Sequence, residues 1–265
     1  MNGFAPGSGR RDHRAEDRQE IHMAVAEADA GVGLSSELEE FVQKVKEEAT
    51  LAFEVFRETG TLTANGTVGF VERTPDGDKL VTVNYPGPFN RGQPVRATVV
   101  GFDGTVYLGK SGAGAKRYQK LFEQHPDVTT ISHVHSPALG AWAQTHRTLP
   151  IRYVPVQRYN LIRELPVYID RRQQEVDFIL DVLKQDIHHT AILEANGGST
   201  VWGREGLRKT AEFILLLEEG ARIQLEAEAI GGSRDYGPGV LKQQWKMAGL
   251  YEKAGSLGLL RPSDL

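Results

Sequence analysis

The chain has 265 residues, of which 40% are hydrophobic, and its 31 basic and 35 acidic side chains give a formal net charge of −4. This length and composition can bury one sizeable core, and the slightly acidic balance speaks against nucleic acid as the main partner. The sequence contains no cysteine, which excludes disulfides, thiolate metal sites and cysteine nucleophiles. No run approaches the roughly 18 apolar residues of a membrane span, so we expect a cytoplasmic protein without a membrane partner.

Residues 1–33 are rich in Gly, Arg, Asp and Glu, so we expect a mobile tail ahead of one domain over residues 34–265. The alternative is an arm that folds onto a neighbouring subunit, because residues 22–25 form a short apolar patch. A capping Ser35 or Ser36, followed by glutamates and then by apolar residues at helical spacing, predicts a helix that ends near Gly60. Runs typical of strands follow at residues 67–72, 79–84, 95–102 and 105–108.

The second half of the chain alternates helical and strand patterns. Helices are predicted over residues 115–124, 137–145, 171–185, 207–229 and 240–254, and strands over residues 128–135, 190–195 and 199–202. Interleaved helices, strands and hairpins predict an α/β sandwich around a mixed, mostly antiparallel sheet.

The densest chemical signal is the segment 131–143, in which a strand containing His133 and His135 runs into a helix of small residues. Side chains two positions apart on a strand point to the same face, so both imidazoles lie side by side, as a metal ion requires. The alternative is two histidines satisfied in the core or on the surface, because a lone His-x-His motif is weak evidence.

A strand that ends in His-x-His-Ser-Pro ahead of such a helix resembles the class II aldolase/adducin family, which includes fuculose-phosphate aldolase and ribulose-phosphate 4-epimerase. The resemblance covers roughly residues 35–254, with further matching segments at residues 126–128, 195–198, 202–203 and 217–221. It implies an α/β/α sandwich around a nine-stranded, mainly antiparallel sheet and a divalent metal at His133 and His135. It also implies a homotetramer whose active sites lie at subunit interfaces.

The chain departs from the family pattern at the other catalytic positions. The family's Ser-Ser-Glu or Ser-Ser-Asp carboxylate falls on Gly114, and its third metal histidine falls on Gly197. The family's phosphate-binding turns correspond to residues 66–69 and 86–87 but lack its hydrogen-bonding residues, so a phosphorylated substrate is not expected. The epimerase tyrosine aligns with Trp245, which has no hydroxyl. We expect Trp245 to be a core or interface anchor, and the alternative is a pocket for an aromatic substrate.

Glu194 is the candidate for a third metal ligand, because it stands in an otherwise apolar strand where the family usually has leucine. An unpaired buried carboxylate costs on the order of several kcal/mol, so it implies a cation or another polar partner nearby. The alternative is a salt bridge to Arg152, Arg158 or Arg163. Strict alternation also places Glu194 on the face opposite Ala195 and Gly197, so that a bulge or turn would have to bring it to the metal.

Two histidines and one carboxylate with open positions are typical of Fe(II) oxygenases. On this set and on segments 194–198 and 231–239, the chain resembles the aldolase-fold non-heme iron oxygenases of novobiocin and clorobiocin biosynthesis. These oxidatively decarboxylate a prenylated 4-hydroxyphenylpyruvate to a mandelate and then to a benzoate. The resemblance implies Fe(II), with zinc or manganese as alternatives, and an aromatic 2-oxo or 2-hydroxy acid as the small-molecule substrate.

Arg158 is the candidate for binding the substrate carboxylate, and Tyr118 for donating a hydrogen bond to the substrate. A surface or inter-subunit ion pair is the alternative for Arg158, and helix packing is the alternative for Tyr118. Two further functions stay open. One is a lyase in which a divalent metal stabilises an enediolate, which needs a base that the sequence does not name. The other is a non-catalytic scaffold similar to the adducin heads.

Overall fold

The computed structural model describes residues 33–90, 92–110 and 113–264, so the tail predicted for residues 1–33 lies almost wholly outside the described residues. The strands are β1 (Val68–Arg73), β2 (Lys79–Asn84), β3 (Ala97–Gly101), β4 (Val106–Leu108), β5 (Thr130–Val134), β6 (Leu149–Pro150), β7 (Glu164–Leu165), β8 (Val167–Tyr168), β9 (Ala191–Glu194) and β10 (Ser199–Gly203). The helices are α2 (Ser36–Glu58), α3 (Ala113–Gln124), α4 (Pro137–Ala143), α5 (Val154–Gln157), α6 (Glu175–Gln185), α7 (Leu207–Ala229), α8 (Val240–Met247) and α9 (Tyr251–Ser256), with a short 3-10 helix, Pro262–Asp264.

Eight strands form one sheet in the order β4-β3-β2-β1-β5-β10-β9-β8, and β6 pairs with β7 in a separate ribbon. Neighbours in the large sheet are antiparallel except for β8 beside β9. The predicted α/β class with a mixed, mostly antiparallel sheet is therefore confirmed. The nine strands that the resemblance implies are not found, because the main sheet of the described residues has eight.

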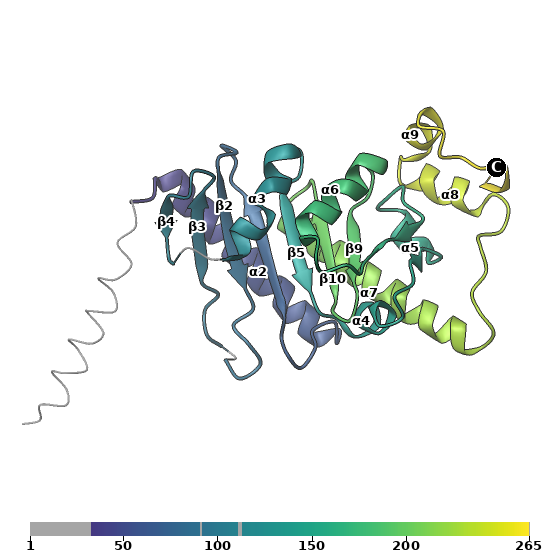
Figure 1. Cartoon of the computed structure of the whole chain (residues 1–265), viewed down its shortest axis with the longest axis horizontal. Helices are drawn as coiled ribbons and strands as arrows, with labels where there is room; N and C mark the ends of the chain where they lie inside the picture. Colours follow the sequence, from purple (N-terminus) through teal and green to yellow (C-terminus); the bar gives the residue numbers. More distant parts are fainter. Residues whose placement is uncertain (1–32, 91, 111–112, 265) are drawn as a thin grey trace, which may run out of the picture.

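Helices cover both faces of this sheet. In Figure 1 its strands lie side by side and follow one another across the molecule from β4 to β9. One face packs with α2, α4 and α7 in a core that includes Phe56, Phe70 and Leu217. The other face packs with α3 and α6 around Leu121 and Ile179. Because neighbouring strand residues point to opposite faces, β5 contributes Val134 to the first core and Ile131 to the second.

The predicted single helix over residues 240–254 is wrong in one respect. Helix α8 ends at Met247, and α9 begins at Tyr251. Between them, Gly249 has φ +69°, a left-handed conformation that a residue with a side chain rarely adopts. The glycine ends the first helix and lets the chain turn, so that α8 and α9 pack beside each other at the end of the molecule far from β4 (Figure 1).

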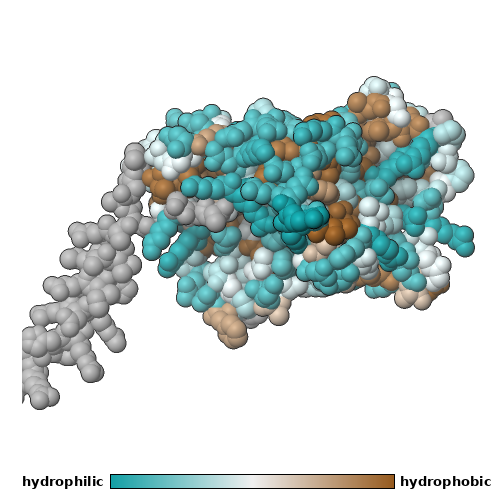
Figure 2. Space-filling view, viewed as in Figure 1, coloured by the Kyte–Doolittle hydropathy of each residue, from teal (hydrophilic) through white to brown (hydrophobic). Residues whose placement is uncertain are grey.

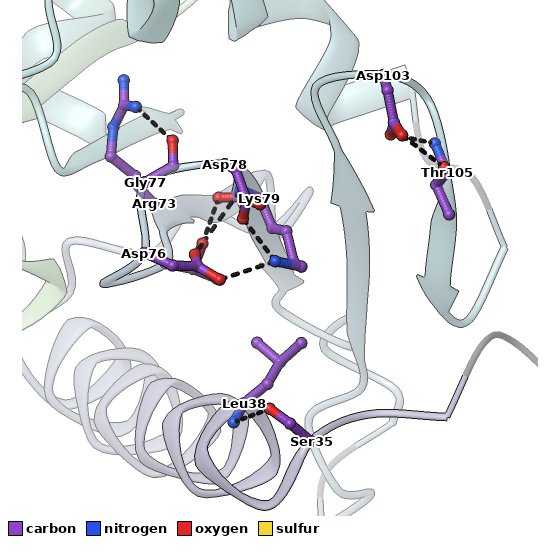
Figure 3. A network of polar contacts seen from close by, with 10 residues as sticks. Ser35, Leu38, Arg73, Asp76, Gly77, Asp78, Lys79, Asp103 and Thr105 are labelled. Atoms are coloured by element: carbon purple, nitrogen blue, oxygen red, sulfur yellow. Dashed lines mark hydrogen bonds and ion pairs between the residues drawn. The ribbon is translucent and has the colours of Figure 1, made fainter.

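Local polar contacts fix the start of α2 and the turn between β1 and β2 (Figure 3). Ser35 Oγ accepts a hydrogen bond from Leu38 N at 3.3 Å, which confirms the predicted cap. In the turn, Lys79 Nζ donates to Asp76 Oδ2 at 2.7 Å. Since β1 pairs antiparallel with β5, this turn lies at the end of the sheet where β5 begins, opposite the end that carries His133.

The molecular surface in Figure 2 is mostly hydrophilic, with hydrophobic residues in separate patches. The two most exposed large apolar side chains, Phe89 and Ile230, stand in different loops. Among the residues that the structure describes, no helix has both the length and the apolar character needed to cross a membrane.

Candidate metal centre

Strand β5 carries His133 on the face covered by α3 and α6, at its carboxyl end. His133 lies opposite Gly69 of β1 and Thr200 of β10. The ring centroids of His133 and His135 are 5.0 Å apart, with the rings nearly perpendicular. The prediction that the two imidazoles lie side by side is therefore confirmed.

Glu194 reaches the same face through sheet register. Ile192 lies opposite Thr200, which itself lies opposite His133, so Glu194, two positions after Ile192, points to the His133 side. His133 Nδ1 lies 3.2 Å from Glu194 Oε1. The expectation that a bulge or turn must bring Glu194 round is wrong, because ordinary alternation already places it beside His133.

Gly197 lies beside this carboxylate, at a position where an added Cβ would make only ordinary van der Waals contacts. A Cβ on Gly197 would lie 3.5 Å from Glu194 Oε2. The preceding residue, Asn196, has φ +58° and forms the tight turn between β9 and β10, in which Gly197 N donates to Glu194 O at 2.9 Å. Glu194 thus lies beside the position where the resemblance places the missing histidine.

Glu175 joins His133 and Glu194 as the third member of the cluster, and the sequence alone did not point to it. It is the first residue of α6 and is only 5% exposed. One ligand atom from each of His133, Glu175 and Glu194 lies within 4.8 Å of the other two. The sequence does contain a sign that Glu175 is buried. Glu175 stands four residues before the buried Ile179, so it lies on the buried face of the helix.

Two hydroxyl groups hold Glu175 in place. Tyr118 Oη donates to Glu175 Oε2 at 3.1 Å, and Thr200 Oγ1 donates to Glu175 Oε1. The hydroxyl of Tyr118 is therefore engaged by a cluster residue, and its ring is buried against α6. That Tyr118 donates to a substrate stays a prediction. Its hydrogen bond to Glu175 gives it a role in positioning that carboxyl group.

Arginines pair with both carboxylates, but they are not the expected ones. Arg117 Nη2 contacts Glu175 and lies 3.0 Å from Glu194 Oε1, and Arg171 Nη1 lies 2.8 Å from Glu194 Oε2. The expected partners are engaged elsewhere: Arg152 pairs with Asp235, Arg158 donates to Gln244, and Arg163 pairs with Asp264. The prediction of a salt bridge for Glu194 is thus confirmed in kind and wrong in its partners.

Burial and charge act differently on the two carboxyl groups. Burial raises the pKa of Glu175, and the neighbouring Glu194 carboxylate raises it further. Burial also acts to raise the pKa of Glu194, but hydrogen bonds from His133 and Arg171, with the charge of His133, outweigh burial and lower it. Glu194 is therefore held as the anion, whereas Glu175 retains a proton more readily than an ordinary carboxyl group.

These donors fit a divalent ion. Imidazole nitrogen and carboxylate oxygen are ligands for iron, manganese and zinc, and the described residues bring one imidazole and two carboxylates together without cysteine. His133 Nδ1 now donates to Glu194 and Thr200, which places its proton on that nitrogen. An ion among the three side chains would replace this proton and the Arg117 contacts, so binding would depend on pH.

His135 is held differently. Asn65 Oδ1 accepts hydrogen bonds from Thr67 N at 3.0 Å and from the Thr63 hydroxyl at 2.8 Å, so its Nδ2 faces His135 Nδ1, 3.2 Å away. An amide nitrogen donates, so His135 Nδ1 accepts and the neutral ring keeps its proton on Nε2. Burial lowers the pKa of His135, as does the charge of His133. Metal binding by His135 stays a prediction. It requires that the hydrogen bond between Asn65 Nδ2 and His135 Nδ1 change, because the ring nitrogen that binds a metal must carry no proton.

The remaining predicted site residues lie apart from the cluster within one chain. Trp245 is fully buried among Leu161, Leu241 and Ala254. Its neighbour Gln244 accepts a hydrogen bond from Arg158 Nε at 2.7 Å. The structure does not bring either Trp245 or Arg158 to His133.

Two cavities adjoin the cluster. One, of about 270 Å³, is lined by Arg117, Tyr118, His133 and residues of β1 and β2. The other, of about 230 Å³, is lined by Arg117, Tyr168, Arg171 and Glu175. Gly114 lines the first cavity, and a Cβ there would meet only Thr82 Cγ2 at 3.5 Å. The position of the missing family carboxylate therefore does face the site, with room for a side chain.

Comparison with protein families gives one match. Residues 51–225 match the class II aldolase and adducin N-terminal domain. The chain belongs to the class II aldolase/adducin family. The matched residues include the His-x-His strand, Glu175 and Glu194, so every member of the cluster lies within the family domain.

Solved structures of this family share the fold. YgbL of Escherichia coli is 22% identical, covers 77% of this chain and 99% of its own, and has a TM-score of 0.61. An L-fuculose 1-phosphate aldolase is 16% identical, with 83% and 98% covered and a TM-score of 0.63. The L-fuculose 1-phosphate aldolase of Glaciozyma antarctica is 20% identical, with 85% and 91% covered and a TM-score of 0.62. No curated protein matches the sequence.

Proposed function

We propose that this class II aldolase-fold protein is a divalent-metal enzyme acting on a C–C bond of a small, non-phosphorylated aromatic 2-oxo or 2-hydroxy acid. The reaction we propose is Fe(II)-dependent oxidative decarboxylation. The observation that carries the proposal is the meeting of His133, Glu175 and Glu194 within 4.8 Å, beside two cavities. Buried acidic groups that gather around an imidazole next to a cavity are typical of metal sites with open positions.

The donor set supports iron or manganese over zinc. The carboxylate and third histidine of the resembling enzymes are replaced by Gly114 and Gly197, and carboxylates from β9 and α6 lie beside His133 instead. A set rich in oxygen donors suits harder divalent ions than a three-histidine set does. A bound Fe(II) would supply the reaction with O2 that oxidative decarboxylation requires.

The cavity walls support the proposed substrate class. Val71, Tyr118 and Ile131, whose side chains lie on the His133 face of the sheet, line the cavity beside His133 and give it apolar groups against which an aromatic ring can pack. The turn 66–69 also lines it, but only Thr67 of these residues carries a side-chain donor. The side chains of this turn give a phosphate few of the hydrogen bonds that it has in the resembling enzymes, which supports a substrate without phosphate.

The chain's own residues hold the ligand groups in place. Thr200 contacts both Glu175 and His133, and Tyr118 fixes the second oxygen of Glu175. Carboxylates and hydroxyls that orient a metal-binding imidazole tune its basicity. Glu175, whose pKa is raised without an ion, would release its proton on binding one, so we expect metal affinity to fall as the pH falls.

The proposal includes a homo-oligomer. Arg158 is exposed and lies away from His133 in one chain, so it can act on a substrate only at the site of another copy. The predicted role of Trp245 would require in addition that its ring leave the core in which it is fully buried. Light scattering of the purified protein would measure the assembly. A monomer at all concentrations would remove Arg158 and Trp245 from the proposed site.

The test is metal analysis of protein purified without oxygen, beside a His133→Ala/His135→Ala variant. We expect stoichiometric iron in the wild type and its loss in the variant, followed by oxygen uptake and CO2 release with 4-hydroxyphenylpyruvate. Activity with zinc alone and without oxygen uptake would contradict the oxygenase. Equal metal content in both proteins would instead favour a non-catalytic scaffold.

A metal-dependent lyase acting on a hydroxy-ketone is the second candidate. It lacked a base in the sequence analysis, and Glu175 is a carboxyl group of raised pKa beside the cluster that could serve as one. Two proteins of the same fold are L-fuculose 1-phosphate aldolases. Cleavage of a hydroxy-ketone under anaerobic conditions, abolished by Glu175→Gln, would favour this candidate.

A further inference from the structure

The two arginines of the cluster are held very differently. Arg171 donates to Glu194 Oε2 at 2.8 Å and to Ala195 O at 3.0 Å, and its guanidinium lies 4.7 Å from the ring centre of Tyr168. These contacts include a backbone carbonyl and an aromatic face, which stay in place whatever binds to Glu194. Arg171 is therefore anchored independently of the carboxylate.

Arg117 also lies over an aromatic ring, but among the described residues it donates no hydrogen bond to a backbone carbonyl. Its Nη2 alone contacts both Glu175 and Glu194, and its guanidinium lies 5.3 Å from the ring centre of Tyr118. Within the described part of the chain its Nε and Nη1 donate no hydrogen bond. The side chain is 42% exposed, so one edge of the guanidinium fork is available to a planar carboxylate.

Arg117 also lies between the two cavities, since it lines both of them. His133 lines the first cavity, and Arg171 lines the second. A ligand that occupies either cavity next to the cluster therefore meets the Arg117 guanidinium.

The charges of the cluster require an anion once an ion is present. Glu175 and Glu194, if both ionised, balance Arg117 and Arg171, so a divalent ion leaves the site with an excess of two positive charges. An excess of positive charge in a partly buried site favours an anionic ligand.

Resting on the proposed function, we propose that Arg117 is the residue that selects a substrate carboxylate. When a divalent ion takes the oxygens of Glu175 and Glu194, Arg117 releases them and pairs through its fork with the carboxylate of the substrate, while Arg171 stays in place. The ion and the anionic substrate then strengthen each other's binding, because each favours the same position of Arg117. Arg158, the candidate from the sequence, is not needed for this contact.

Calorimetric titration of the full chain tests this inference with Mn²⁺ and phenylpyruvate as probes. The variants are Arg117→Gln, Arg117→Lys and the control Arg172→Gln, whose side chain is 92% exposed and pairs only with Asp170 among the described residues. The uncharged methyl ester of phenylpyruvate is the control ligand. Arg117→Lys keeps the charge beside the buried carboxylates if Arg117→Gln fails to fold.

We expect Arg117→Gln to weaken phenylpyruvate binding to the Mn²⁺-loaded protein by about tenfold or more, as loss of a charged hydrogen-bond partner does. Arg117→Lys should give a smaller loss, and Arg172→Gln none. Mn²⁺ alone should bind Arg117→Gln at least as tightly as wild type, because a competitor for the carboxylates is gone. Binding of the methyl ester should not change.

Equal phenylpyruvate affinities in Arg117→Gln and Arg172→Gln would overturn the inference and leave the metal site intact. The inference would also be overturned if the methyl ester bound the wild type as tightly as phenylpyruvate does, or if phenylpyruvate did not bind at all. Failure of Mn²⁺ and Fe²⁺ to bind the wild type would instead overturn the proposed function, and the inference with it.

Discussion

The two faces of the sheet treat buried glutamates in opposite ways at the end of β5. On the α7 face, Glu218 is 1% exposed and accepts hydrogen bonds from Ser136 Oγ at 2.7 Å, Ala138 N at 2.7 Å and Leu139 N at 3.0 Å. On the α6 face, Glu175 and Glu194 are held by arginines, hydroxyls and His133.

The difference lies in what the partners can do. Backbone N–H groups at the start of α4 cannot leave Glu218 without unwinding the helix, so this carboxylate has a structural role. Arg117 is a long, half-exposed side chain beside two cavities, so the carboxylates that it contacts can exchange this partner. Burial alone therefore does not distinguish a functional carboxylate from a structural one. The distinction lies in whether the partners of the carboxylate can move away from it.

The largest effect is expected from Glu218→Ala. Loss of the helix cap and of the partner of Ser136 should lower the free energy of unfolding by roughly 3–4 kcal/mol, because three donors lose a charged acceptor. Urea unfolding followed by circular dichroism measures this. An unchanged midpoint would contradict the structural role. Glu218→Gln keeps one acceptor oxygen, so its midpoint should lie between those of the wild type and Glu218→Ala.

Glu194→Gln should have the opposite pattern. It removes a ligand charge and leaves His133 only a neutral amide oxygen as acceptor, so Mn²⁺ affinity should fall by on the order of 100-fold, while the unfolding midpoint changes much less than in Glu218→Ala. Calorimetry and urea unfolding of the same samples give both numbers. A variant that unfolds early but binds Mn²⁺ normally would assign Glu194 to the structural class.

A further effect is expected at Glu72, a buried glutamate of β1 that accepts a hydrogen bond from the Thr130 hydroxyl. Burial raises its pKa from 4.5 to about 8. The folded state then binds more protons than the unfolded state between these values, so stability is full below pH 4.5 and falls as the pH rises to 8.

Glu72→Gln should remove this loss. We expect the wild type to lose stability between pH 4.5 and pH 8.5 that the variant keeps, so that the two proteins differ most at pH 8.5 and little at pH 4.5. Thermal unfolding across this pH range measures the change. An identical pH dependence in both proteins would show that Glu72 ionises in the folded protein without cost.

Sequence reasoning was most successful where the signal is local. Alternation and helical spacing predicted the strands and helices, and the spacing of His133 and His135 placed both on one face, because these patterns depend on neighbours along the chain. The break between α8 and α9 at Gly249 was missed, since glycine is tolerated within many helices.

The rest of the site depends on contacts between distant segments. Arg117 and Glu194 are 77 positions apart, and Tyr118 and Glu175 are 57 apart. Only the register of β9, β10 and β5, together with the packing of α3 on α6, brings these side chains together. The sequence indicated that Glu194 needs a cation, and the fold decides which arginine supplies it.

The smallest effect concerns Asn65, which decides whether His135 can join the ligands. In Asn65→Asp, one carboxylate oxygen can keep the bond from Thr67 N, while the other accepts from His135 Nδ1. The ring then carries its proton on Nδ1 and presents a lone pair on Nε2, as metal-binding imidazoles with a carboxylate partner do. If His135 is a ligand, Mn²⁺ should bind Asn65→Asp up to about tenfold more tightly than wild type. The gain should vanish in a His135→Ala background, and a gain that persists there would trace to the added negative charge instead of the imidazole.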